Sequence, residues 1–263
     1  MQSEDDSPTN TIRLGDREIP RIGLGTNRLR ISPANVSFIR HAVEVGAQMI
    51  DTAHLYTDGE SEQTVGLALS GMTTDYFIAT KGGYGGAGQG RPDVLHRQID
   101  ESLERLRRRR LDLYYLHRVD PETPLEDSLR AIKERVDAGQ IARVGISEVT
   151  VDEIERATRI VPIAAVQNNY SLAERKHDAV VDYCAEAGIV FVPFFPLRGA
   201  DTPAVQSMAK RHGATPRQIA LAWLLRRSPT MLPIPGTLSL EHLQQNVRAQ
   251  SLELSDDDVA ALR

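Results

Sequence analysis

The chain has 263 residues, of which 41% are hydrophobic and 25% charged, a composition that excludes both a mini-protein and a disordered chain. Its 36 acidic and 31 basic residues leave a net charge of −5, so neither nucleic acid nor an anionic membrane surface is an expected partner. The single cysteine, Cys184, excludes an intrachain disulfide. Because no secretory signal begins the chain and no apolar stretch reaches the roughly 18 residues that cross a bilayer, we expect a soluble, cytoplasmic protein.

The beginning of the chain divides into two parts. Residues 1–10 are acidic and polar without periodicity, which predicts a loose tail. Residues 11–20 alternate apolar and polar side chains around Gly15 and Asp16, which indicates a short β-hairpin. We expect residues 11–263 to form one domain that begins with this hairpin.

A helix, a glycine and a short buried strand follow one another repeatedly along the chain. In the first instance Ser32 and Pro33 begin a helix that ends near Gly46, and a strand at residues 48–51 follows directly. The pattern returns within residues 129–146 and 179–192. Strands that are separated by crossover helices pair in parallel, so the sequence predicts a parallel sheet.

Eight strands are predicted in total, and units of about 30 residues fill nearly the whole chain. The fold class is therefore α/β, a single (β/α)8 TIM barrel with a short N-terminal β-hairpin. A doubly wound sheet is the alternative, but no GxGxxG motif opens the first helix. The predicted strands are residues 22–24, 48–51, 76–80, 111–116, 141–146, 163–167, 189–192 and 231–234.

A run of arginines between Arg105 and Arg110 has two interpretations. It could bind phosphate, or it could end a helix, where cations interact favourably with the negative end of the helix dipole. We favour the solvated helix end.

Chemically active side chains stand at the ends of the predicted strands, where a barrel builds its site. Asp51 ends the second strand, Lys81 the third and His117 the fourth, while Tyr56 lies in the loop after Asp51. An unperturbed tyrosine has a pKa of about 10, and an ammonium such as that of Lys81 lowers it. Asp51 would keep the buried lysine charged, and His117 would hydrogen-bond the substrate oxygen. The four residues therefore predict a tuned proton donor.

Two other interpretations of these residues are possible. Taken alone, each of these residues could instead have an ordinary structural role. A metal-dependent hydrolase would use Asp51, His54, His117 and Asp120 as ligands, but the chain has no HxH or HExxH motif and this scheme leaves Tyr56 without a role. We therefore predict no metal.

Six phrases at or near the predicted strand ends carry a family resemblance. They are IGLGT (22–26), GAQMIDTAHLY (46–56), ATKGG (79–83), LDLYYLHRVDP (111–121), GQIARVGIS (139–147) and IPGT (234–237). In this order they resemble the aldo-keto reductases, from about Thr11 to Arg263. The further phrases QNNYSLAER (167–175) and VPFFPL (192–197) are most similar to a bacterial branch that includes pyridoxal reductases.

The resemblance implies reduction of an aldehyde or ketone to an alcohol by a reduced nicotinamide. Tyr56 would protonate the carbonyl oxygen, Lys81 and Asp51 would tune Tyr56, and His117 would orient the substrate. NADPH is the expected cofactor and NADH stays an alternative. A nucleotide-binding barrel with a sensor or partner role and little turnover is the other function that we consider.

The resemblance also implies a cofactor site across the C-terminal mouth of the barrel. Glu148 replaces an asparagine that is usual in the family, and Gly236 and His242 stand where the family often has a lysine and an arginine for the adenosine 2′-phosphate. Thr237 and Ser239 are neutral candidates for that phosphate. The full predicted set is Gly25, Thr26, Asp51, Ser147, Glu148, Gln167, Phe194, Leu197, Gly236, Thr237, Ser239, His242, Gln245 and Asn246.

The predicted substrate is a small carbonyl compound. Its pocket is expected to contain Leu55, Tyr84, His117, Arg118 and Arg198, with the arginines either binding an anionic group or lying on the surface. The sequence gives no prediction of oligomeric state.

Overall fold

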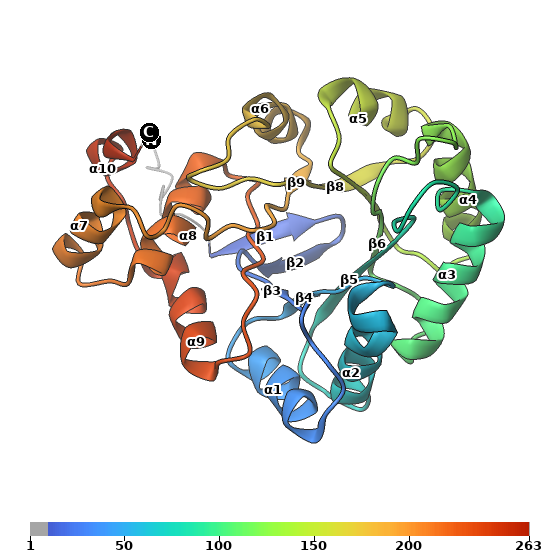
Figure 1. Cartoon of the computed structure of the whole chain (residues 1–263), viewed down its shortest axis with the longest axis horizontal. Helices are drawn as coiled ribbons and strands as arrows, with labels where there is room; N and C mark the ends of the chain where they lie inside the picture. Colours follow the sequence, from blue (N-terminus) through green and yellow to red (C-terminus); the bar gives the residue numbers. More distant parts are fainter. Residues whose placement is uncertain (1–9, 263) are drawn as a thin grey trace, which may run out of the picture.

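A computed structural model describes residues 10–262, and its centre is a curled sheet of seven parallel strands surrounded by helices (Figure 1). The strands pair in chain order from β3 to β9, so each helical crossover joins neighbours. This confirms the predicted α/β barrel. The strands are β3 (Leu24–Gly25), β4 (Met49–Asp51), β5 (Phe77–Gly82), β6 (Leu113–Leu116), β7 (Val144–Ser147), β8 (Ile163–Gln167) and β9 (Val190–Phe191).

Residues 231–236 close the barrel between β9 and β3. They form a parallel bridge to Phe191 on one side, and on the other the Gly23 N–H donates to the carbonyl of Pro233 at 3.0 Å. Pro233 and Pro235 have no N–H to donate, so this segment makes isolated bridges instead of a continuous ladder. The predicted eighth strand therefore occupies the eighth position without forming a regular strand.

The helices begin where the sequence provides caps. The Ser32 side chain accepts a hydrogen bond from the Asn35 N–H, and Pro33 occupies the first helical turn, as predicted for α1. Capping boxes start α5, α8 and α10. The helices are α1 (Pro33–Glu44), α2 (Glu60–Leu69), α3 (Pro92–Arg105), α4 (Leu125–Asp137), α5 (Val151–Thr158), α6 (Asp178–Ala187), α7 (Pro203–Arg211), α8 (Pro216–Arg227), α9 (Leu240–Arg248) and α10 (Asp256–Ala261), with 3-10 turns η1 (Tyr56–Gly59) and η2 (Ala249–Ser251).

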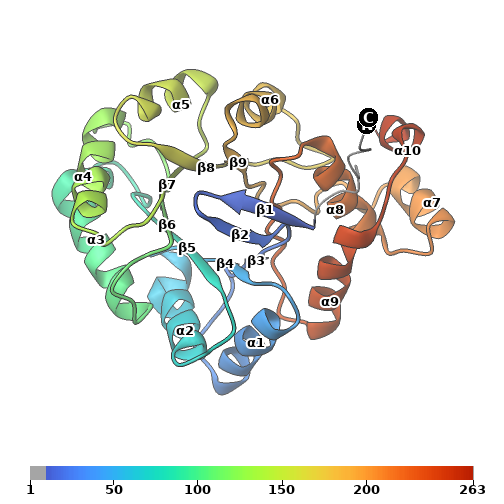
Figure 2. The ribbon, with the colours of Figure 1, turned by 180° about the vertical axis from the view of Figure 1, so that it is seen from behind.

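The predicted hairpin lies across the barrel end that faces the reader in Figure 2. Strands β1 (Thr11–Leu14) and β2 (Arg17–Pro20) pair antiparallel around Gly15, whose φ of +65° favours glycine. Its apolar side chains, Leu14 among them, pack on the first residues of the barrel strands, such as Met49 and Phe77. The hairpin thus closes the N-terminal end of the barrel and leaves the opposite end for a site.

The beginning of the chain lies mostly outside the described residues. Of the predicted loose tail at residues 1–10, only Asn10 is described, and its carbonyl accepts a hydrogen bond from the Arg21 N–H at 3.1 Å. Among the described helices, none is both long and apolar enough to span a membrane.

The arginine run ends a helix, as favoured from the sequence. Arg105 is the last residue of α3 and pairs with Glu62 and Glu101. Arg107 follows with a φ of +56°, a left-handed conformation that closes the helix end. Arg108 pairs with Asp112 at 3.5 Å, so part of the positive charge is already neutralised.

Candidate active site

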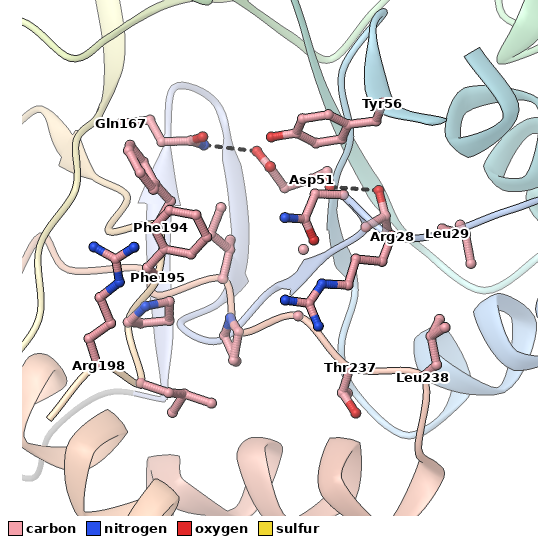
Figure 3. A pocket seen from close by; sticks show the side chains of 18 of the residues that line it. Arg28, Leu29, Asp51, Tyr56, Gln167, Phe194, Phe195, Arg198, Thr237 and Leu238 are labelled. Carbon is pink, nitrogen blue, oxygen red and sulfur yellow. Dashed lines mark hydrogen bonds between the residues drawn. The ribbon is translucent and has the colours of Figure 1, made fainter. Parts of the chain in front are cut away.

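A cavity of about 1040 Å³, here called the main cavity, opens at the C-terminal ends of the strands. Figure 3 shows Tyr56 and Asp51 on one side of it, with Phe194, Phe195 and Arg198 on the other. The predicted residues that line it are Gly25, Thr26, Asp51, Tyr56, Tyr84, His117, Arg118, Gln167, Phe194, Leu197, Arg198, Gly236, Thr237, Ser239 and His242.

The floor of the main cavity holds a buried ion pair. Lys81 Nζ donates to Asp51 Oδ1 at 2.5 Å and to the Thr52 carbonyl at 2.7 Å, and the Lys81 side chain is 0% exposed. Gln167 Nε2 donates to the other Asp51 oxygen at 2.9 Å. Removing two charges from water is costly unless hydrogen bonds satisfy them, so these contacts hold both side chains in one geometry.

Tyr56 and His117 lie above this ion pair. Their ring centroids are 5.9 Å apart, edge to face, and Lys81 Nζ lies 5.1 Å from the Tyr56 ring centroid. Burial, with the positive charges of Lys81 and Arg118, lowers the pKa of His117 well below its usual value. The imidazole is therefore neutral at physiological pH, and its buried Nδ1 has no hydrogen-bond partner among the described residues.

The pKa of Tyr56 differs from the prediction. Burial raises it above the usual value of 10.0, and this effect outweighs the neighbouring ammonium of Lys81, which lowers it as expected. The net shift is upward because the phenolate loses more hydration than the Lys81 charge restores. Tyr56 therefore keeps its proton at neutral pH, as an acid must before it donates.

The loop that carries Tyr56 has a strained backbone. Thr57 and Asp58 have φ values of 50° and 57°, in the left-handed region that non-glycine residues rarely occupy. The Thr57 hydroxyl donates to the Leu29 carbonyl at 2.7 Å, which ties this loop to the loop after β3. Such strain persists where the surrounding structure fixes it, and it often accompanies a functional side chain.

Besides Lys81, which is buried beneath the main cavity, four predicted site residues lie outside the lining of the main cavity and of the adjoining cavity described below. Ser147 is buried and its hydroxyl accepts from Arg118 Nη1 at 3.0 Å. Leu55 is 36% exposed, and Gln245 donates to Glu241 on the surface. The fourth is Glu148.

Glu148 directs its carboxylate away from the main cavity. One oxygen accepts from the Asn169 N–H at 2.6 Å and the other lies 3.4 Å from Lys176 Nζ. Burial raises the pKa of Glu148, but the nearby His177 ring at 3.7 Å, the hydrogen bond from the Asn169 N–H and the charge of Lys176 outweigh burial and lower the pKa to about 2. Its predicted contact with a carboxamide stays a prediction.

Sequence reasoning missed one wall of the main cavity. Asn27, Arg28 and Leu29 line it from the loop after β3, and Phe195 and Leu238 line it from two other loops. Asn27 and Arg28 follow a strand end directly, and this position could have marked them as site residues. The loop has no periodicity, however, from which the direction of their side chains could be inferred.

The proposed ligands of the metal alternative are not brought together. His54 pairs with Glu101 at 2.6 Å, and Asp51 with Lys81. The Asp120 carboxylate accepts hydrogen bonds from the backbone N–H groups of Gly88 and Gly90. In the described part of the chain, no three histidine, cysteine, aspartate or glutamate residues form a group that could hold a metal ion.

The main cavity therefore combines a protonated phenol, a buried ammonium and a neutral imidazole beneath an aromatic wall. The phenol can give a proton to an oxygen, and the ammonium stabilises the resulting phenolate. This arrangement can protonate a substrate oxygen on which negative charge develops.

Comparisons with known proteins agree with this fold. The model of the aldo/keto reductase family matches residues 21–202 and 199–263, so the chain belongs to that family. An uncharacterised oxidoreductase of Schizosaccharomyces pombe is 35% identical over 98% of this chain and 90% of its own length. Pyridoxine 4-dehydrogenase of Escherichia coli is 34% identical over 97% of each chain.

Solved structures include a similar enzyme with a bound nucleotide. An aldo/keto reductase of Klebsiella pneumoniae, crystallised with NADP and acetate, has a TM-score of 0.88 and 29% identity. The match covers 97% of this chain and 94% of that one. The family and its barrel predicted from the sequence are thereby confirmed.

Proposed function

We propose that this chain is an NADPH-dependent reductase that converts an aldehyde or ketone to an alcohol, with Tyr56 as the proton donor. The observation that carries the proposal is the buried Lys81–Asp51 pair beneath the phenol of Tyr56 and beside the neutral ring of His117, all at one cavity. The alternative, a nucleotide-binding sensor, would not require a buried ammonium beneath a protonated phenol.

The residues present fit a nicotinamide dinucleotide. Phe194 offers an aromatic face, Gln167 an amide, and Thr237 and Ser239 hydroxyl groups along the main cavity. Asn246, which lines an adjoining cavity, is 2% exposed and its Oδ1 has no hydrogen-bond partner among the described residues, as expected for a group that awaits a ligand. The reduced nicotinamide would supply hydride to the carbonyl carbon.

Residues of the chain supply the proton that the carbonyl oxygen receives. Tyr56 donates its phenolic proton to the carbonyl oxygen as negative charge develops there, and the Lys81 ammonium stabilises the phenolate that remains. Asp51 neutralises Lys81 in the ground state, so the lysine stays charged although it is buried. The neutral His117 orients the same oxygen by hydrogen bonding.

The walls of the main cavity favour an aromatic or apolar aldehyde. Tyr84 and Phe195 are 46% and 45% exposed at its rim, and Arg118 lies 5.1 Å from the Tyr84 ring centroid and 5.7 Å from that of Phe194. Arg118 has no carboxylate partner among the described residues, which leaves its charge available for a polar or anionic substituent. The pyridoxine dehydrogenase among the relatives adds pyridoxal to the compounds to be tested.

The test is a panel of aldehydes and ketones, pyridoxal included, followed at the nicotinamide absorbance with NADPH and with NADH. We expect oxidation of NADPH that depends on the carbonyl compound, with an alcohol as the product. Tight binding of NADPH without oxidation on any member of the panel would instead support the nucleotide-binding sensor.

A further inference from the structure

A second cavity, here called the adjoining cavity, continues from the main cavity away from Tyr56 and His117. Its volume is about 670 Å³, and its new walls include Arg217 from the first turn of α8 and Asn246 from α9. The two cavities share Leu197, Arg198, Gly236, Thr237 and His242. A ligand whose reactive end lies at Tyr56 can therefore extend into the adjoining cavity.

Two arginines of the adjoining cavity carry unneutralised charge. The guanidinium groups of Arg198 and Arg217 form no ion pair or hydrogen bond within residues 10–262, although the Arg198 guanidinium lies 4.3 Å from the Phe195 ring centroid. Arg226, on the same helix as Arg217, does pair, with Asp256 at 2.6 Å. Because Asp201 is the single carboxylate of this cavity's lining, the wall has a net positive charge.

The loop after the barrel-closing segment lacks comparable charge. Gly236 has no side chain, and the Thr237 hydroxyl accepts a hydrogen bond from the Ser239 N–H at 3.0 Å. The Ser239 hydroxyl in turn caps α9 through the His242 N–H. Each hydroxyl oxygen thus accepts a local hydrogen bond and keeps its own hydrogen to donate, but neither side chain carries a charge to pair with a phosphate.

The resemblance to the family implies that the adenosine end of NADPH lies at this side of the barrel mouth, and we infer that Arg217, together with Arg198 of the same cavity, binds the 2′-phosphate there. This inference rests on the proposed function. The unpaired guanidinium groups supply the positive charge that Gly236, Thr237 and Ser239 lack, and Asn246 Oδ1 in the same cavity is an unpaired acceptor for a donor group of the adenosine. Cofactor preference would then be determined by the α8 side of the cavity, because a guanidinium binds phosphate through charge-assisted bonds.

The experiment measures dissociation constants by isothermal titration calorimetry for NADPH, NADH and adenosine 2′,5′-bisphosphate. We expect Arg217→Gln to weaken NADPH and the bisphosphate about tenfold or more, because a bond to a charged group is lost, while NADH changes less than about twofold. Arg217→Lys keeps the charge and should lose less. Arg226→Gln is the matched control, with the same charge removed from the same helix outside both cavities, and it should leave all three constants unchanged.

Several results would overturn the inference. Equal weakening of NADPH and NADH would place Arg217 on a part shared by both cofactors, and no change would remove it from the site. Loss of NADPH preference in His242→Gln with none in Arg217→Gln would assign the phosphate to the first turn of α9 instead. If the wild-type protein bound no NADPH, the proposed function itself would fail. If it bound NADPH but the Arg217 variants behaved like the control, only the inference about Arg217 would fail.

Discussion

Tyr56 is held protonated because burial affects its pKa more strongly than the ammonium of Lys81 does. Carbonyl reduction needs the phenol, which exists below the pKa, and that pKa lies above 10.0. We therefore expect kcat/KM for reduction to be constant from about pH 6 to 9 and to fall only above about pH 10. His117 adds no transition near pH 6.5 because its pKa lies well below that value.

The pH dependence is measured with a saturating cofactor and a carbonyl substrate that does not itself titrate. A fall in kcat/KM centred near pH 8 would mean that the phenol is more acidic than its surroundings indicate. A transition near pH 6.5 would mean that the His117 imidazole gains a proton during turnover.

At the scale of single residues, the sequence was informative where a side chain stands at a strand end. Asp51, Lys81 and His117 could be predicted because parallel strands bring their carboxyl ends to one edge. Glu148 could not, because its direction depends on Lys176 and the Asn169 N–H, which approach only in the folded chain.

At the scale of elements, the end of α3 offers a test of backbone strain. Arg107 has a φ of +56° and an exposed side chain, at the position after a helix where glycine is favoured. We expect Arg107→Gly to raise the free energy of unfolding by about 0.5–1 kcal/mol, because glycine adopts this conformation without a steric cost.

Denaturant unfolding measures this change. Arg109→Gly is the matched control, with an exposed side chain two residues away and no positive φ, and it should leave stability unchanged or lower it. If both substitutions raised the free energy of unfolding equally, the cause would be the reduced positive charge between Arg105 and Arg110 and not the backbone conformation.

The elements also show which features of the fold local sequence patterns can predict and which they cannot. Helix caps such as Ser32 act through neighbours three residues away, so the beginning of α1 could be predicted from local sequence. The segment at 231–236 reads as an apolar strand, but Pro233 and Pro235 limit it to isolated bridges. Its place in the barrel depends on two distant partners, Phe191 about 40 residues before it and Gly23 about 200 residues before it.

At the scale of the whole molecule, the barrel assembles one reactive group from distant parts of the chain. Residues at the C-terminal ends of β4, β5 and β6 meet only because consecutive strands pair in parallel, and the hairpin covers the opposite end. The resulting cavity has polar, titratable groups at one end and unpaired guanidinium groups at the other. This distribution of groups supports our proposal of an extended anionic cofactor with its reactive end beside Tyr56.

The central claim is that Tyr56 gives the proton, and the hydride-transfer rate in a single turnover of Tyr56→Phe tests it most directly. We expect this rate to fall by about 10² to 10⁴ while the NADPH dissociation constant stays within about twofold, since the phenol acts on the substrate oxygen. Tyr183→Phe, which removes a phenol on α6 outside both cavities, should retain the wild-type rate. A Tyr56→Phe variant that transferred hydride at the wild-type rate would contradict the account.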